Sequence, residues 1–254
     1  AQASSGLSIG ESFRCITRGM ADACFCGGAE SKLNPMAYYR QQLTGRLTGS
    51  SNDQPEQAIK PYDTQADGTA LGEGGGILIL EAVESAQQRQ VPIHAELVGF
   101  AASHGVNPLS GGLRPEPQGL AIEQAMRRAL EDAGIDAEAV DAVVGFGCGE
   151  PEFDAAEARA IKRLFGERAG EVPIWSATPY VGDCGAGIGG MAAALAVKML
   201  QTQTLPPRIN CATAIEGLNA ASCDAKSMAL EHVLVTQSSL AGQTCALVFK
   251  KASQ

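Results

Sequence analysis

The side chains that could carry chemistry include eight cysteines and three histidines. Cys24 and Cys26 stand two residues apart, so on a strand both would face the same side. A zinc site there is only weakly indicated, because the chain has no CxxC pair and its histidines stand apart from the cysteines. Reduced, buried thiols are the favoured interpretation. They predict a cytoplasmic protein without a metal.

The composition limits the kinds of partner that the chain could have. Its 254 residues carry 19 basic and 28 acidic side chains, a formal charge of -9. Nucleic acid and anionic membranes need a basic face, so neither is expected as the main partner. The longest weakly polar stretch, residues 185–197, is too short and too rich in glycine to span a membrane. Hydrophobic residues make up 45% of the chain, enough for one large domain or two small ones.

The pattern of apolar residues predicts an α/β protein. Helix and strand patterns alternate in the second half and end in a strand pair, which is typical of a layered domain. The apolar run at 74–83 predicts a strand buried on both faces, and the run at 21–30 a short buried strand. Asp154 and Glu157, three residues apart, predict an N-terminal cap for their helix. Helices are expected at 4–18, 117–134, 154–166 and 185–201, and further strands at 95–103, 140–147, 172–178, 232–239 and 243–251.

The first part of the chain does not predict a complete domain. It offers one helix, two good strands and a long polar loop over residues 43–72. We therefore expect a preceding segment of the same fold to exist elsewhere, either as a separate chain or as a removed portion.

Several motifs resemble one family in its own order. SIGESFRCITRGMADACFCGGAES (8–31) resembles the helix and strand that follow the nucleophile of β-ketoacyl synthases. KPYDTQADGTALGEGGGILILE (60–81) resembles another signature of that family, and HAELVGFAAS, DAAEARAIKRLFG and LPPRIN also match. The resemblance covers the part of a synthase from the nucleophile onward. It implies a thiolase-like, layered α-β-α-β-α fold whose first half is incomplete here, with residues 1–92 in the N-terminal half and 93–254 in the C-terminal half.

The resemblance also locates the positions where the family keeps its catalytic groups. The nucleophilic Cys corresponds to Gln2, the two His residues to Phe146 and Asp183, and a Lys to Thr178. A carboxamide cannot form an acyl thioester. Phe146 cannot donate a hydrogen bond to an enolate, and an ionised Asp183 would repel it. We therefore expect no catalytic residue and no cofactor.

A relative with Gln at the nucleophile position and no His pair resembles the chain-length factor, the β subunit of type II polyketide ketosynthases. Residues 27–48 and 149–166 resemble that branch more than the active synthases. The resemblance implies a heterodimer with an active ketosynthase α subunit that together serve an acyl carrier protein, and a role in shaping the tunnel of the growing chain. Loading decarboxylases also carry the Gln but retain both His residues.

An independent enzyme is the alternative. Gln2, or the cluster of Asp183, Cys184 and Cys148, could serve a malonyl decarboxylase or an acyl hydrolase. The cysteines are explained more simply as small residues that fill the space of lost His side chains, and Asp183 as a helix cap. Two further expectations concern architecture: helices 4–18 and 185–201 lie between two sheets, and strand 21–30 lies near a subunit interface.

Overall fold

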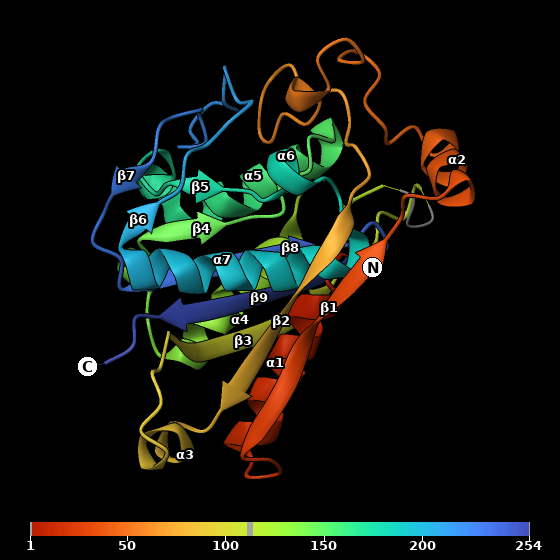
Figure 1. Ribbon diagram of the computed structural model, residues 1–254. Coiled ribbons are helices and arrows are strands. Elements are labelled where there is room, and N and C mark those ends of the chain that lie inside the picture. Colours follow the sequence, from red (N-terminus) through yellow and green to blue (C-terminus); the bar gives the residue numbers. More distant parts are fainter. Residues whose placement is uncertain (1, 111–113, 254) are drawn as a thin grey trace.

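The main sheet has five strands in the order β3-β9-β8-β4-β5. The computed structural model describes residues 2–110 and 114–253 (Figure 1). Strand β4 runs parallel to β5 and β8, whereas β9 runs antiparallel to β8 and β3. The strands are β3 (Glu96–His104), β4 (Ala142–Val144), β5 (Ile174–Trp175), β8 (His232–Ser238) and β9 (Gln243–Lys250).

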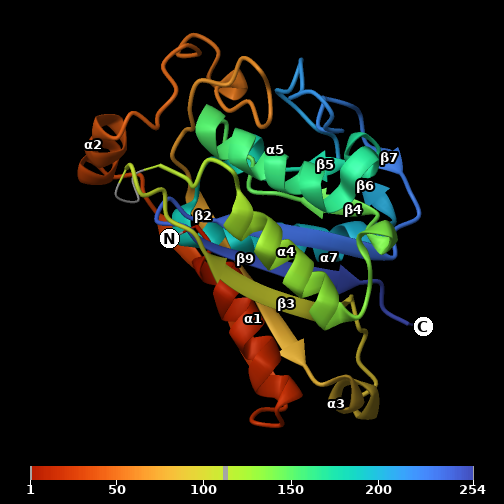
Figure 2. The same cartoon turned by 180° about the vertical axis from the view of Figure 1, so that it is seen from behind.

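Helices cover both faces of this sheet. Cover on both faces is needed because apolar side chains along its central strands point alternately to the two faces. Val143 and Leu234 face a core shared with α4 (Leu120–Ala133) and α5 (Pro151–Phe165), the helices in front of the sheet in Figure 2. Val144, Val233 and Val235 belong to a second core with α1 (Ser4–Thr17) and α7 (Ile188–Thr202). Successive strand residues point to opposite faces, so the two cores are separate.

A second, two-stranded sheet packs on the side of α1 and α7 that faces away from the five-stranded sheet (Figure 1). It pairs β1 (Ala23–Ser31) with β2 (Glu73–Glu81) in antiparallel register. The layers are therefore helix, sheet, helix and sheet, which confirms the layered α/β fold and the central place of α1 and α7. Glycines allow the backbones of β2 and α7 to approach closely, because a Cβ on Gly190 would lie 2.2 Å from the carbonyl oxygen of Gly76.

The expectation that β1 and β2 are buried is wrong. Only one face of this sheet packs on α1 and α7, and exposure alternates along both strands. Phe25, Ile77 and Ile79 point away from the helices and are 81%, 62% and 64% exposed. The apolar runs of β1 and β2 therefore place apolar side chains on both faces of the sheet, but only one of these faces packs against the rest of the protein.

The remaining elements are short. The strands expected at 140–147 and 172–178 are reduced to three and two residues, so Phe146 and Thr178 lie beyond the strands that precede them. Within the described residues, no helix combines the length and the apolar character needed to cross a bilayer. The other elements are α2 (Pro35–Leu43), α3 (Val83–Gln88), α6 (Thr178–Val181), β6 (Thr204–Leu205), β7 (Lys226–Ser227), and the 3₁₀ turns η1 (Pro55–Gln57), η2 (Ala137–Ala139), η3 (Gly166–Gly170) and η4 (Gly185–Gly187).

Candidate functional site

Two of the positions singled out by sequence meet in a direct hydrogen bond. Gln2 precedes α1 and is 2% exposed, and its Nε2 donates to Oδ2 of Asp183 over 2.9 Å. Asp183 is fully buried between α6 and η4, and its Oδ1 accepts the N–H of Gly185 over 2.9 Å. This bond braces the start of the η4 turn, whereas Gly187 is the N-cap of α7 and no side chain caps that helix, so the expected role of Asp183 as its cap is wrong. The Gln2 carboxamide is held by an acidic side chain.

An arginine that sequence reasoning missed completes this cluster. Arg46 is 2% exposed, and its Nη2 lies 3.3 Å from Oδ2 of Asp183. Its Nε donates to Oε1 of Glu150 over 2.8 Å. Burial alone would lower the pKa of Arg46, but the hydrogen bond to Glu150 and the charges of Glu150 and Asp183 raise it above its ordinary value. Arg46 lies in the polar loop of residues 43–72 and near the end of the segment 27–48 that resembles the chain-length-factor branch, but neither feature indicates that its side chain is buried.

The two nearby cysteines are poor nucleophiles. Burial, followed by the charges of Glu150 and Asp154, raises the pKa of Cys148 well above its ordinary value. Burial and the charge of Asp183 raise the pKa of Cys184 to about 11. Because both pKa values are raised, both side chains are neutral thiols near pH 7. The thiolate is the reactive form of cysteine, so neither side chain is activated for nucleophilic attack.

Phe146 and Thr178 make no hydrogen bond to this cluster. The ring of Phe146 meets that of Phe153 edge-to-face, with centroids 5.9 Å apart and planes at 83°. The Thr178 hydroxyl donates to the carbonyl oxygen of Gly147 and lies 3.0 Å from the Ser176 hydroxyl. Both positions therefore contribute packing and backbone bracing.

Two buried carboxylates on α5 brace the loop that carries Phe146. Asp154 accepts the N–H groups of Tyr62, Cys148 and Gly149, and Glu157 accepts those of Phe146 and Gly147. The expected capping role is wrong: α5 begins at Pro151, so both residues lie within the helix and bind a loop instead.

These two carboxylates also have perturbed acidity. Burial raises the pKa of Asp154 to about 7, and the negative charge of Glu157 adds to the shift, against the hydrogen bonds from the backbone. Burial likewise raises the pKa of Glu157. The Tyr62 hydroxyl donates to Glu157 over 2.8 Å, so a residue from a distant loop shares the brace.

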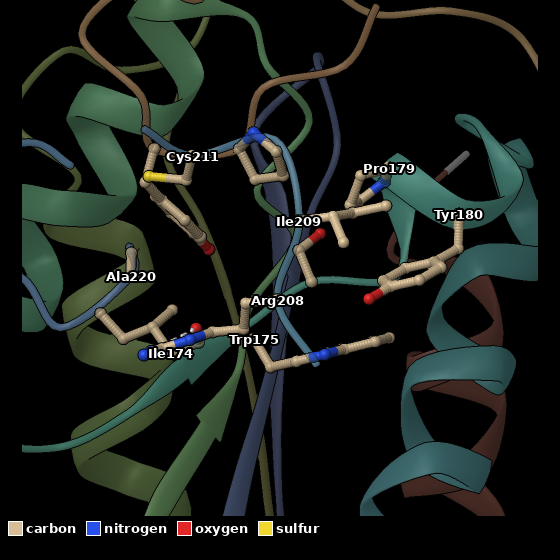
Figure 3. Close-up of a pocket in the computed structure, with 11 residues that line it drawn as sticks. Ile174, Trp175, Pro179, Tyr180, Arg208, Ile209, Cys211 and Ala220 are labelled. Atoms are coloured by element: carbon tan, nitrogen blue, oxygen red, sulfur yellow. Dashed lines mark hydrogen bonds between the residues drawn. The ribbon is translucent and has the colours of Figure 1, made fainter. Parts of the chain in front are cut away.

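The pocket shown in Figure 3 does not offer a substrate site. Its volume is about 10 Å³, roughly that of a single water. Trp175 and Tyr180 stack with centroids 5.5 Å apart, and both donate to the carbonyl oxygen of Pro207, over 2.9 and 2.6 Å. Among the described residues, no group of three or more His, Cys, Asp or Glu side chains could hold a metal ion.

Sequence comparison assigns both parts of the chain to one family. The model "Beta-ketoacyl synthase, N-terminal domain" matches residues 1–86, and "Beta-ketoacyl synthase, C-terminal domain" matches residues 94–212. A 3-oxoacyl-acyl-carrier-protein synthase 2 from Synechocystis is 35% identical over 203 residues, 80% of this chain and 48% of the relative. The enzyme of that name from Staphylococcus aureus is 32% identical over 246 residues, 96% and 58% of the two chains. The chain thus spans about half the length of these relatives.

Solved structures agree with this assignment. A type II polyketide ketosynthase in complex with its acyl carrier protein, AntDE:AntF, is 27% identical with a TM-score of 0.92, and the match covers 98% of this chain and 61% of the other. The ishigamide ketosynthase/chain length factor is 26% identical with a TM-score of 0.89, covering 99% and 59%. A β-ketoacyl synthase from Burkholderia phymatum is 30% identical with a TM-score of 0.89, covering 100% and 60%. The layered fold, the motifs and these matches show that the chain belongs to the β-ketoacyl synthase family.

Proposed function

We propose that this chain is a non-catalytic, chain-length-factor-like subunit. It would pair with an active ketosynthase α subunit and shape the tunnel in which a polyketide or fatty-acyl chain grows on acyl carrier protein. The observation that carries the proposal is the buried cluster at the nucleophile position, where Gln2 is tied to Asp183 and Arg46.

The chemistry of this cluster argues against condensation. Decarboxylation of a malonyl thioester needs hydrogen-bond donors aimed at the developing enolate oxygen. The Gln2 amide already donates to Asp183, the Arg46 guanidinium is engaged by Glu150 and Asp183, and Phe146 has no donor in its side chain. A carboxylate at the centre of the site opposes a second negative charge.

The outer sheet supports the existence of a protein partner. Strand β1 pairs with β2 along one edge, and in the described residues no strand covers its other edge. One face of this sheet packs on α1 and α7, but the open strand edge of β1 still invites pairing with a further strand. We propose that a partner subunit, or a further segment of the same fold, covers this sheet through an obligate interface of more than about 2,000 Å².

The comparisons support a role in chain elongation more broadly than this subtype. The curated relatives bear the name of a synthase, whereas one solved relative is a ketosynthase/chain length factor. The independent decarboxylase or hydrolase has less support, because the thiols of Cys148 and Cys184 have raised pKa values and the Gln2 amide is engaged.

The test incubates the purified chain with acyl and malonyl carrier protein, once with a candidate ketosynthase α subunit and once without it. We expect no acyl adduct on this chain by intact mass in either case. Product should appear only when the α subunit retains its Cys-His-His set. A covalent adduct on any residue of this chain, or turnover without the α subunit, would overturn the proposal.

A further inference from the structure

A buried carboxamide on strand β8 has no hydrogen-bond partner among the described residues. Gln237 is 1% exposed, and neither Nε2 nor Oε1 of its side chain is bonded to another part of the protein that the structure describes. Within residues 2–110 and 114–253, no other buried side chain leaves two polar atoms unpaired. Burying an amide without partners is costly, so we expect a group outside the chain to satisfy it.

The Gln237 side chain points toward the start of helix α1. Gln237 pairs with Cys245 across β8 and β9, so the two side chains share one face of the sheet. Sγ of Cys245 contacts the carbonyl oxygen of Ala3 over 3.7 Å. A Cβ on Gly189 of α7 would lie 3.4 Å from Cγ of Gln237 and 3.0 Å from the nitrogen of Gly6. Gln237 therefore meets the first turn of α1 beside Gly189.

This first turn offers hydrogen-bond donors. The first helical bond that the structure gives for α1 runs from the Leu7 N–H to the Ala3 carbonyl oxygen, so the Gly6 N–H precedes it. No side chain caps this helix in the described residues. Oγ of Ser5 accepts the Gly190 N–H over 2.8 Å, which leaves the hydroxyl proton of Ser5 to donate. The start of α1 is therefore a buried group of donors that lies next to an unpaired amide.

The charges around this place favour a neutral ligand. The N-terminal end of a helix carries a partial positive charge, which disfavours a cation. The buried Asp183 carboxylate binds Gln2, which directly precedes this end of α1, and so disfavours a second anion. Burial raises the pKa of Cys245 to about 12, so its thiol is neutral and balances no charge. A neutral ligand that both donates and accepts hydrogen bonds fits best.

We propose that Gln237 and the first turn of α1 together bind one internal water molecule. This water donates to Oε1 of Gln237 and accepts from the Gly6 N–H or the Ser5 hydroxyl, within the about two to four bonds typical of buried waters. Immobilising one water costs little compared with leaving an amide and a helix end unpaired. The water ties β8 to the helix that follows Gln2, and this role is independent of the proposed function.

The sign of one substitution separates a hydrated amide from a dry one. Methionine is close to glutamine in size but makes no strong hydrogen bond. In a dry site, Gln237→Met would remove an unpaired polar group and raise Tm. In a hydrated site it removes the partners of the water and leaves the α1 donors unpaired, so we expect Tm to fall by about 2–6 °C. The control Gln124→Met, on the exposed side of α4, should change Tm by less than about 2 °C.

A high-resolution crystal structure of the wild-type protein gives the direct observation. We expect one ordered water about 2.7–3.2 Å from the Gln237 amide and from a donor in the first turn of α1. The proposal is overturned if the amide bonds only to protein groups, if no water is seen there, or if an ion occupies the place. A Tm of Gln237→Met that rises or matches the control overturns it as well. If the variant does not fold, the wild-type structure decides. None of these outcomes bears on the carrier-protein assay, so the proposed function is tested separately.

Discussion

Replacing Arg46 with methionine tests the buried cluster most directly. The Arg46 side chain is 2% exposed, and its partners Glu150 and Asp183 are 7% and 0% exposed. Methionine keeps much of the aliphatic volume but removes the positive charge, which leaves two carboxylates buried without a cation. We therefore expect Arg46→Met to lower the free energy of unfolding far more than the loss of one hydrogen bond would.

The expected magnitude follows from the burial of the ions. Breaking a buried ion pair by removing one partner costs about 3–5 kcal/mol. For a chain of this size, 1 kcal/mol corresponds to about 2–4 °C in melting temperature, so Tm should fall by roughly 6–20 °C. The variant Arg46→Met/Glu150→Gln/Asp183→Asn should recover much of this loss, because it removes the charges together and keeps groups that can bond Gln2 and Gly185.

The assay is thermal and urea denaturation followed by circular dichroism, with Arg128→Met as the control. Arg128 is exposed on α4, so its replacement should change stability by no more than about 0.5 kcal/mol. The reasoning is refuted if Arg46→Met behaves like this control, or if the triple variant is less stable than Arg46→Met.

Three further predictions concern single positions. Gln2→Cys should yield no acyl adduct by intact mass, because the new thiol would lie beside the Asp183 carboxylate, which disfavours the thiolate; rapid acylation would contradict this. The pKa of Asp154 is raised to about 7, so its stabilising contribution is full below about pH 4 and lost as the pH rises through 7. Asp154→Asn should flatten the fall of Tm between about pH 4 and 7, and an unchanged slope would count against it. Gly190→Ala should cost about 1–3 kcal/mol by overpacking against β2, whereas Gly49→Ala, with open space around its Cβ, should be near neutral in urea melts.

The main layers of the fold could be predicted because their patterns are local. The spacing of apolar residues in α4 and the Gly/Ala content of α7 indicated helices, and the runs in β8 and β9 indicated buried strands. The apolar run of β2 could not reveal that this strand has a protein neighbour on only one face. Ile77 and Leu78 are both large aliphatic residues, so the sequence does not show which of them is exposed. The division into residues 1–92 and 93–254 stays a prediction.

The site was predicted only in part, and for a physical reason. Motif order brought Gln2 and Asp183 to one place, although they are 181 positions apart in the sequence. Arg46 and Glu150 belong to the same cluster, but they are 104 positions apart, and the segments 27–48 and 149–166 that contain them do not show that the two side chains pair. The brace formed by Asp154 and Glu157 looked like a helix cap, because spacing within a helix does not show which distant backbone groups a carboxylate will bind.

On the proposed function, the ionic cluster of Arg46, Glu150 and Asp183 also constrains the mutations that could give this chain catalytic activity. Changing Asp183 to histidine alone sets an imidazole beside the Arg46 guanidinium and takes the carboxylate acceptor from the Gln2 amide. Changing Arg46 first strands two acidic groups in the interior. Each first step is therefore unfavourable without the others, and building a catalytic set at these positions needs several simultaneous replacements. On the proposed function, the buried charges of Arg46, Glu150 and Asp183 make a loss of activity easy to retain and hard to reverse.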